Sequence, residues 1–197
     1  MDIMLDLETF GRGNNAAIVQ IGAVKFDRKT GEIDPSHFSC NVSAESCVKA
    51  GMEMDADTVQ WWMQQGDEAR KSILNPVGQD IKASLILFNR WIDSHNDQGG
   101  SKNNIHLWSH ATFDFPIFLN AFDKCDIKPS FSFRGARDLR TLTDMADVLY
   151  WTEEYQASHP RTGLYHNALD DCIYQVGYAV ESLQKIANAL MVAPSLV

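Results

Sequence analysis

The sequence predicts a single α/β domain over residues 1–197, with a mixed sheet of three antiparallel strands followed by parallel strands, flanked by helices. Two observations predict this fold. Three apolar runs joined by short turns open the chain, and such runs pair most simply as an antiparallel meander. The later part alternates helical patterns with a short apolar strand. No repeat, low-complexity tract or linker divides the chain, so one domain is expected.

The strands are predicted from apolar runs bounded by turn residues. The N-terminal three are expected at residues 3–9, 17–26 and 38–42. Glycine-containing turns at residues 12–15 and 29–32 separate them. A short central strand is expected at residues 105–109, after a polar surface loop at residues 96–104.

The helices are predicted from apolar residues at 3.6-residue spacing. They are expected at residues 59–65, 79–95, 114–122, 141–150 and 168–191. The second has an apolar face at Ile81, Leu85, Phe88 and Ile92. The last has a longer apolar stripe at Leu169, Cys172, Val176, Val180, Leu183, Ala187 and Leu190.

Composition limits the classes of function. The chain has 17 Lys and Arg against 26 Asp and Glu, a net charge of −9, which argues against neutralising the phosphates of a long duplex. Contact with nucleic acid would be local and would use bound cations. No signal peptide or apolar run of about 18 residues is present, so we expect a cytoplasmic protein without a membrane partner. The cysteines show no zinc or disulfide spacing and are expected to be reduced thiols: Cys40, Cys47, Cys125 and Cys172.

The first strand carries two acids, Asp6 and Glu8, inside an apolar run. Side chains at i and i+2 of a strand point to the same face about 7 Å apart, so these carboxylates are expected side by side. Like charges held together repel, and unpaired charges near a core are costly, so a positive partner is expected. The alternative is an edge strand with one solvated face, although Asp is depleted in strand interiors.

Other acids and a histidine lie farther along the chain. Asp114 begins a helical pattern, where it could cap the helix, join the other acids or do both. Asp170 and Asp171 lie in the first turn of the last helix, where acids complement the helix dipole. Asp171 lies about 200° around the helix from Leu169 and is free to face a cleft. His166 precedes this helix; a lone histidine is usually structural, but its neighbouring acids favour proton transfer.

The chain also has five further histidines and one adjacent tryptophan pair. Trp61 and Trp62 project in two directions from a helix, so one is expected in the core, and the other, exposed near a cleft, could stack a base. Five histidines show no metal-ligand spacing and are given no metal role: His37, His95, His106, His110 and His159.

The ordered motifs resemble those of the DEDDh exonucleases, a branch of the ribonuclease H-like superfamily that includes proofreading exonucleases, ribonuclease T and oligoribonuclease. The matching segments are residues 6–9, residues 111–117, and His166 with Asp171. The sister DEDDy branch would place tyrosine at Asn167, so the histidine branch fits better. Intervening segments are similar to the phage exonuclease A (DexA) type and its bacterial relatives: residues 58–62, 68–70 and 137–141.

The resemblance implies a ribonuclease H-like fold and removal of nucleoside 5′-monophosphates from single-stranded 3′ ends. His166 is implied as the general base, with activity rising between about pH 6 and 8. Four acids are implied to bind two divalent cations, Mg²⁺ or Mn²⁺: Asp6, Glu8, Asp114 and Asp171. The terminal nucleotide is expected to contact Leu7, Thr9 and Phe113.

Several alternatives stay open. DNA is slightly favoured over RNA as the substrate, because the DexA-like segments lean towards DNA. An exoribonuclease, an endonuclease, a catalytically silent nucleic-acid-binding module and an acidic interaction protein are the competing functions. Exonucleases of this kind are commonly dimers, so a homodimer is also open. The acidic balance predicts action on short or frayed ends.

Overall fold

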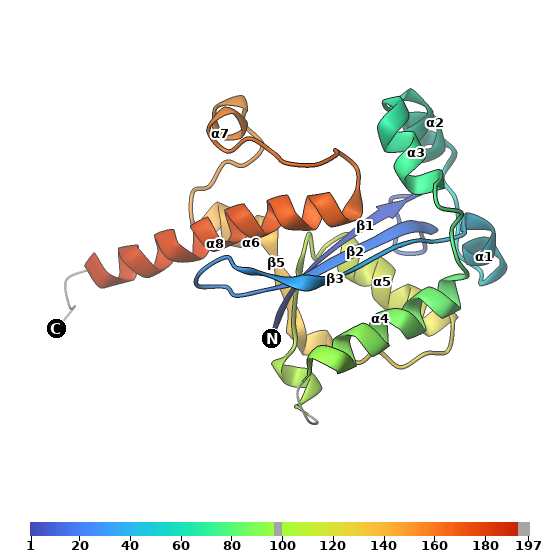
Figure 1. The fold of residues 1–197 in the computed structure, drawn as a ribbon, viewed down its shortest axis with the longest axis horizontal. Coiled ribbons are helices and arrows are strands. Elements are labelled where there is room, and N and C mark those ends of the chain that lie inside the picture. The colour runs from blue at the N-terminus through green and yellow to red at the C-terminus, as the bar shows by residue number, and fades with distance from the viewer. Residues whose placement is uncertain (97–99, 193–197) are drawn as a thin grey trace.

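The computed structural model describes residues 1–96 and 100–192, which contain a five-stranded sheet in the order β3-β2-β1-β4-β5 (Figure 1). The central strand β1 pairs antiparallel with β2 and parallel with β4, and this confirms the predicted mixed sheet. The strands are β1 Asp2–Thr9, β2 Ile18–Phe26, β3 Ile33–Asn41, β4 His106–Ser109 and β5 Ala136–Asp138.

Helices cover both faces of the sheet (Figure 1). On one face, α4 (Ile81–His95) and α5 (Asp114–Lys124) pack on a core that includes Ile3, Leu5 and Leu7 of β1. On the other, α8 (Ala168–Val192) and α6 (Leu139–Met145) pack on a core that includes Met4. The shorter helices are α1 Ala44–Lys49, α2 Ala56–Gln64, α3 Asp67–Leu74 and α7 Glu153–Ser158.

Strand β1 is buried along its whole length. Odd-numbered side chains point to α4 and α5, so the even-numbered acids Asp6 and Glu8 point to the α8 face. An edge strand with a solvated face is therefore not the explanation for these acids. Their burial calls for polar or charged partners around them.

The start of α8 lies directly against β2. A Cβ on Gly22 would lie 2.3 Å from the carbonyl carbon of Ala168, so only glycine permits this approach. The Gln20 side-chain oxygen also accepts a hydrogen bond of 2.7 Å from the Ala168 amide. Because Gly22 pairs with Asp6 in the sheet, this contact brings the first turn of α8, which carries Asp171, next to the acids of β1.

The largest boundary errors lie in α6 and β3, and α2 also begins three residues earlier than expected, at Ala56. Helix α6 is Leu139–Met145 instead of residues 141–150: Asp138 caps it by accepting a 3.1 Å hydrogen bond from the Thr141 amide, and Asp147 adopts φ of +51° beyond its end. Strand β3 begins at Ile33 instead of Phe38. The additional residues form part of an exposed edge and lack an apolar pattern.

The apolar stripe of α8 is only partly buried. It packs on the core as far as Leu183, whereas Ala187 and Leu190 are exposed because the helix runs past the sheet (Figure 1). The expected polar loop ends in a 3₁₀ turn at Lys102–Asn104, and its positions 97–99 lie outside the described residues. Within the described residues, no helix combines the length and hydropathy needed to cross a membrane.

Candidate active site

Four acids from three elements converge at the end of β1. Carboxylate oxygens of Asp6, Glu8 and Asp171 lie within 4.8 Å of one another. Asp6 also belongs to a second group, with Asp114 and His110, whose ligand atoms are equally close. The structure therefore brings together all four acids that the sequence singled out, and Asp6 is shared between the two groups.

Asp114 is fixed by backbone donors rather than acting as a helix cap. Phe113 occupies the N-cap position of α5, so the capping alternative is wrong. One carboxylate oxygen of Asp114 accepts a 3.3 Å hydrogen bond from the Leu7 amide, and the other accepts a 3.0 Å bond from the His110 amide. These bonds connect β1 to the loop before α5 and fix the position of the carboxylate.

The site is poor in positive charge. Burial raises the pKa of Asp6 well above its usual value, and the charges of Asp114, Asp171 and Glu8 raise it further. Burial likewise raises the pKa of Glu8, and it raises that of Asp114 to about 7. Clustered carboxylate oxygens are ligands that Mg²⁺ and Mn²⁺ prefer, and such cations would relieve this repulsion. The donor set therefore fits divalent cations.

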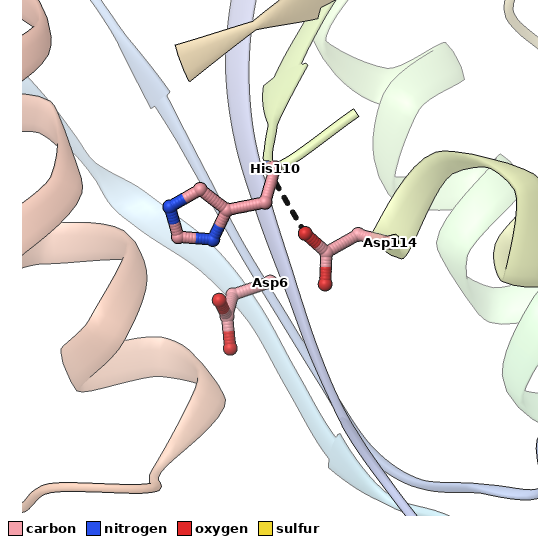
Figure 2. A group of neighbouring side chains, drawn as sticks. All are labelled: Asp6, His110 and Asp114. Carbon is pink, nitrogen blue, oxygen red and sulfur yellow. Dashed lines mark hydrogen bonds between the residues drawn. The ribbon is translucent and has the colours of Figure 1, made fainter. Parts of the chain in front are cut away.

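His110 lies beside Asp6 and Asp114, as Figure 2 shows, although the sequence analysis gave it no metal role. Its Nε2 lies 3.3 Å from the Tyr178 hydroxyl and 3.5 Å from that of Tyr150. Burial, with a smaller effect of the Arg140 charge, lowers the pKa of His110 to about 4, so the imidazole is neutral at pH 7. The spacing of four residues between His110 and Asp114 was the available sequence signal.

Gln175 is a second site residue that the sequence analysis missed. Its side-chain amide donates a 2.6 Å hydrogen bond to Asp6, and this bond offsets part of the effect of burial on the pKa of Asp6. Gln175 lies four residues after Asp171 and therefore on the same face of α8. That i,i+4 spacing was visible in the sequence.

His166 lies against two indole rings next to the acids. Its ring centroid is 4.9 Å from that of Trp61 and 5.9 Å from that of Trp62. As expected, one indole is buried and one is not: Trp62 is 4% exposed and Trp61 is 41% exposed. Burial lowers the pKa of His166, the Asp171 charge raises it, and Arg161 lowers it again.

A cavity of about 460 Å³ opens beside the acids, between the end of β1 and α2. Thr9 and Phe113, two of the residues predicted to contact a terminal nucleotide, line it. Leu7 does not: its side chain is buried in the core, and its amide supports Asp114. The remaining lining residues are Glu8, Gly11, Arg12, Asp57, Thr58, Trp61 and Trp62.

Comparison with known proteins identifies the family. The model of the Rv2179c-like 3′-5′ exoribonuclease domain matches residues 1–183. The exodeoxyribonuclease of Enterobacteria phage T4 is 27% identical over 164 residues, which cover 71% of this chain and 69% of the relative.

Solved structures share the fold at low identity. A 3′-exonuclease that recognises the histone mRNA stem-loop has a TM-score of 0.60 at 15% identity, over 93% of this chain and 81% of that one. Cell-death related nuclease 4 has a TM-score of 0.52 at 14% identity, over 93% of this chain, which spans only 63% of that nuclease. The ribonuclease H-like fold is thereby confirmed. The chain belongs to the Rv2179c-like family and is a 3′-5′ exonuclease.

Proposed function

We propose that this exonuclease uses two divalent cations, Mg²⁺ or Mn²⁺, held by Asp6, Glu8, Asp114 and Asp171. The observation that carries the proposal is the pair of ligand groups that share Asp6, each with ligand atoms within 4.8 Å of one another. A shared carboxylate between two groups suits a two-cation site. The buried acids, with pKa values raised by burial, support the same assignment because they need compensating positive charge.

The proposed division of roles follows from the chemistry of each group. Bound cations would polarise a phosphodiester and lower the pKa of an attacking water. His166 accepts the proton from that water, and its lowered pKa favours the neutral imidazole that this role needs. Gln175 and the amides of Leu7 and His110 orient the carboxylates.

The cavity beside the acids is proposed to hold the 3′-terminal nucleotide. Glu8 lines both the cation site and the cavity, so a nucleotide there would have its phosphate next to the acids. Thr9 and Phe113 line the cavity and are proposed to contact the nucleotide. Leu7, whose side chain is buried, is proposed to contribute only through its amide. The half-exposed ring of Trp61 offers a stacking surface for a base.

We propose single-stranded DNA ends as the favoured substrate, because the phage T4 relative is an exodeoxyribonuclease. RNA is the second candidate, since the matching family is described as exoribonucleases. Residues 1–197 are proposed to act as one exonuclease domain. A homodimer and a cytoplasmic location remain predictions, and sedimentation of the purified chain would test the first.

Digestion of matched 5′-labelled single-stranded DNA and RNA oligomers tests this function. With Mn²⁺, the wild type is expected to give a ladder that shortens from the 3′ end, and EDTA is expected to abolish it. Asp6→Ala is expected to lose the ladder. Asp2→Asn is the matched control, because Asp2 lies on the same strand but pairs with Arg28 away from the site.

Each outcome separates the competing functions. The faster oligomer identifies the favoured nucleic acid. Cleavage of a circular single strand would show endonuclease activity instead. Binding of an oligomer without cleavage in Mn²⁺ or Mg²⁺ would overturn the proposal in favour of a silent binding module.

A further inference from the structure

A buried arginine lies at the edge of the four-acid site. Arg161 belongs to the loop between α7 and α8, which also carries His166. Its side chain is 8% exposed, and its Nη2 pairs with Asp171 and donates a 2.9 Å hydrogen bond to the Leu164 carbonyl. Within residues 1–96 and 100–192, no other Lys or Arg forms an ion pair with the four acids.

The guanidinium of Arg161 is held in place but is incompletely hydrogen-bonded. Its central carbon lies 4.5 Å from the ring centroid of Tyr165 and 5.5 Å from that of Tyr174. Its Nε is buried and has no hydrogen-bond partner in the described part of the chain. An unsatisfied buried donor destabilises the folded state, so an additional acceptor is expected at this group.

An arginine–aspartate pair at the other end of β1 shows what a purely structural contact looks like, with the Arg28 side chain 40% exposed. Arg28 uses two groups on Asp2: Nε donates a 2.9 Å hydrogen bond, and Nη2 lies 2.8 Å from the other carboxylate oxygen. Arg161 instead uses Nη2 alone on Asp171 and leaves Nε free. A guanidinium presents several donors in a fixed fork that matches the oxygens of a phosphate. The contact with Asp171 therefore leaves binding capacity for an anion.

The charge of Arg161 acts on the acids. It lowers the pKa of Glu8 and of Asp171, against the larger effect of burial, which raises both. Cations bound by these carboxylates would take over this neutralisation and weaken the pairing of Asp171 with the guanidinium. Arg161 would then be a buried cation without a full anionic partner, close to the place where a substrate phosphate has to lie.

We propose that Arg161 is a phosphate-binding residue that neutralises Asp171 when cations are absent and binds the scissile phosphate when they are present. The inference rests on the proposed two-cation function and adds a residue to it. The scissile phosphate becomes the 5′-phosphate of the released nucleotide, so a nucleoside 5′-monophosphate reports on the same contact.

Calorimetric titration of Mn²⁺ without nucleic acid tests the first half of the role. Arg161→Gln is expected to bind Mn²⁺ roughly tenfold more tightly than the wild type, because a competing positive charge is removed. Arg28→Gln is the matched control, since it loses an arginine–aspartate pair at the other end of β1. Its Mn²⁺ affinity is expected to equal that of the wild type.

Titration of the Mn²⁺-saturated proteins with thymidine 5′-monophosphate and with thymidine tests the second half. Arg161→Gln is expected to lose roughly tenfold or more in affinity for the monophosphate and to leave thymidine binding unchanged. The monophosphate affinity of Arg161→Lys is expected to lie between those of the wild type and Arg161→Gln, because lysine keeps the charge and lacks the fork of donors.

Wild-type affinity of Arg161→Gln for the monophosphate, or weaker Mn²⁺ binding, would overturn the role and leave Arg161 as a structural partner of Asp171. If circular dichroism shows that Arg161→Gln is unfolded, Arg161→Lys decides, and undiminished monophosphate affinity then overturns the role. A wild type that binds no Mn²⁺ and degrades neither DNA nor RNA overturns the proposed function itself. If the wild type is active and Arg161→Gln has the same Mn²⁺ and monophosphate affinities as the wild type, only the role of Arg161 is overturned.

Discussion

His166 owes its place to an uncommon backbone conformation and to two aromatic neighbours. Its φ of +60° lies in the left-handed region, just before α8 begins. T-shaped contacts with the rings of Trp61 and Trp62 then hold the imidazole beside the acids. The sequence motif predicted the residue, whereas the conformation and the indole contacts needed the structure.

The rate is expected to rise with pH through the pKa of His166 and then to level off, because a general base must be neutral. Burial lowers this pKa below the ordinary value of 6.5. The rise should therefore be centred below that value, earlier than the interval of about pH 6 to 8 expected for a free imidazole. The turnover number with saturating Mn²⁺ and oligomer, measured between about pH 5 and 9, checks this.

Two histidine variants test whether the pH dependence of the turnover number comes from His166. His166→Ala is expected to bind Mn²⁺ normally and to lose roughly 10²- to 10⁴-fold in rate, together with the pH dependence. His110→Gln should leave the midpoint in place, because the pKa of His110 is about 4. A midpoint that moves only in the His110 variant would contradict the assignment.

The two neighbouring tryptophans are expected to respond differently to substitution. Trp61→Ala should raise KM roughly tenfold with little change in Tm, because base stacking contributes about 1–3 kcal/mol and Trp61 is 41% exposed. Trp62→Ala should cost about 3–5 kcal/mol of unfolding free energy, since it leaves a core cavity and loses the 2.9 Å hydrogen bond to the Thr9 carbonyl. Urea unfolding and steady-state kinetics measure both. An unchanged KM in Trp61→Ala would exclude stacking.

At the scale of elements, the junction of β2 with α8 determines where Asp171 lies. Gly22→Ala is expected to lower both Tm and activity, because its Cβ would overlap the backbone of Ala168. Either the helix shifts away from β1 or the strand distorts, and each change separates Asp171 from Asp6. Thermal unfolding and Mn²⁺ titration of the same preparation measure the two effects.

Gly177 in α8 provides the matched control. A Cβ at this position meets no atom within 4 Å, and the residue lies inside the helix. Gly177→Ala is expected to stabilise the protein by about 0.5–1 kcal/mol, because alanine favours the helix. Activity unaffected by both substitutions would show that the β2–α8 contact does not control the site.

Sequence periodicity predicted the helices that bury one face against the sheet. It failed for the exposed edge strand β3 and for the end of α8, which runs past the sheet. The core faces of α4 and the first part of α8 followed from spacing alone. Edge strand β3 has no such pattern, and Ala187 and Leu190 continue an apolar stripe beyond the sheet that would bury it. Periodicity describes a face of an element and contains no information about how far its neighbour extends.

In the candidate site, too, sequence spacing predicted some residues and only the folded structure revealed the others. Motif order predicted the four acids and His166, and the four-residue spacings of His110 from Asp114 and of Gln175 from Asp171 were a further sequence signal for this site. Arg161 lies in an irregular loop and reaches Asp171 by folding of that loop. Because loops have no period, neither Arg161 nor the arrangement of the cavity could be derived from spacing.

For the molecule as a whole, the acids make stability without cations depend on pH. Asp6 and Glu8 have pKa values raised well above 3.8 and 4.5 by burial, and that of Asp114 is about 7. A raised carboxyl pKa means that the folded state binds the proton more tightly. Stability is therefore complete below the unfolded pKa and falls as pH rises through the folded pKa.

In EDTA, Tm is expected to fall as pH rises from about 4, the unfolded carboxyl pKa, through the raised folded pKa values, of which that of Asp114 is about 7. The buried histidines oppose part of this fall below about pH 6.5, because burial lowers the pKa of their folded forms, and above that pH they no longer contribute. Saturating Mn²⁺ should raise Tm by roughly 5–10 °C and reduce the slope, since a ligand at 100 times its Kd contributes about 2.7 kcal/mol. Differential scanning calorimetry with and without Mn²⁺ measures both.

Asp6→Asn is the informative variant for this trend. It removes one charge from both ligand groups, so the fall of Tm with pH in EDTA should become shallower and the response to Mn²⁺ should shrink. Asp2→Asn, on the same strand, should keep the wild-type slope. Equal slopes in all three proteins would mean that the four acids are not the source of the pH dependence.

The contact between Gly22 and Ala168 fixes the elements that carry three of the acids, and it does not involve the β1–β2 turn or α2, which form part of the cavity wall. Asp6, Glu8 and Asp171 lie on a strand and a helix that this contact fixes to each other. The cavity wall includes Arg12 from the β1–β2 turn and Asp57 from α2, both outside that fixed pair. Libraries that randomise Arg12 and Asp57 but keep Trp61 and Trp62 are therefore expected to alter which nucleotide is accepted without disturbing the proposed hydrolytic centre, which would suit this scaffold to directed evolution of new end preferences.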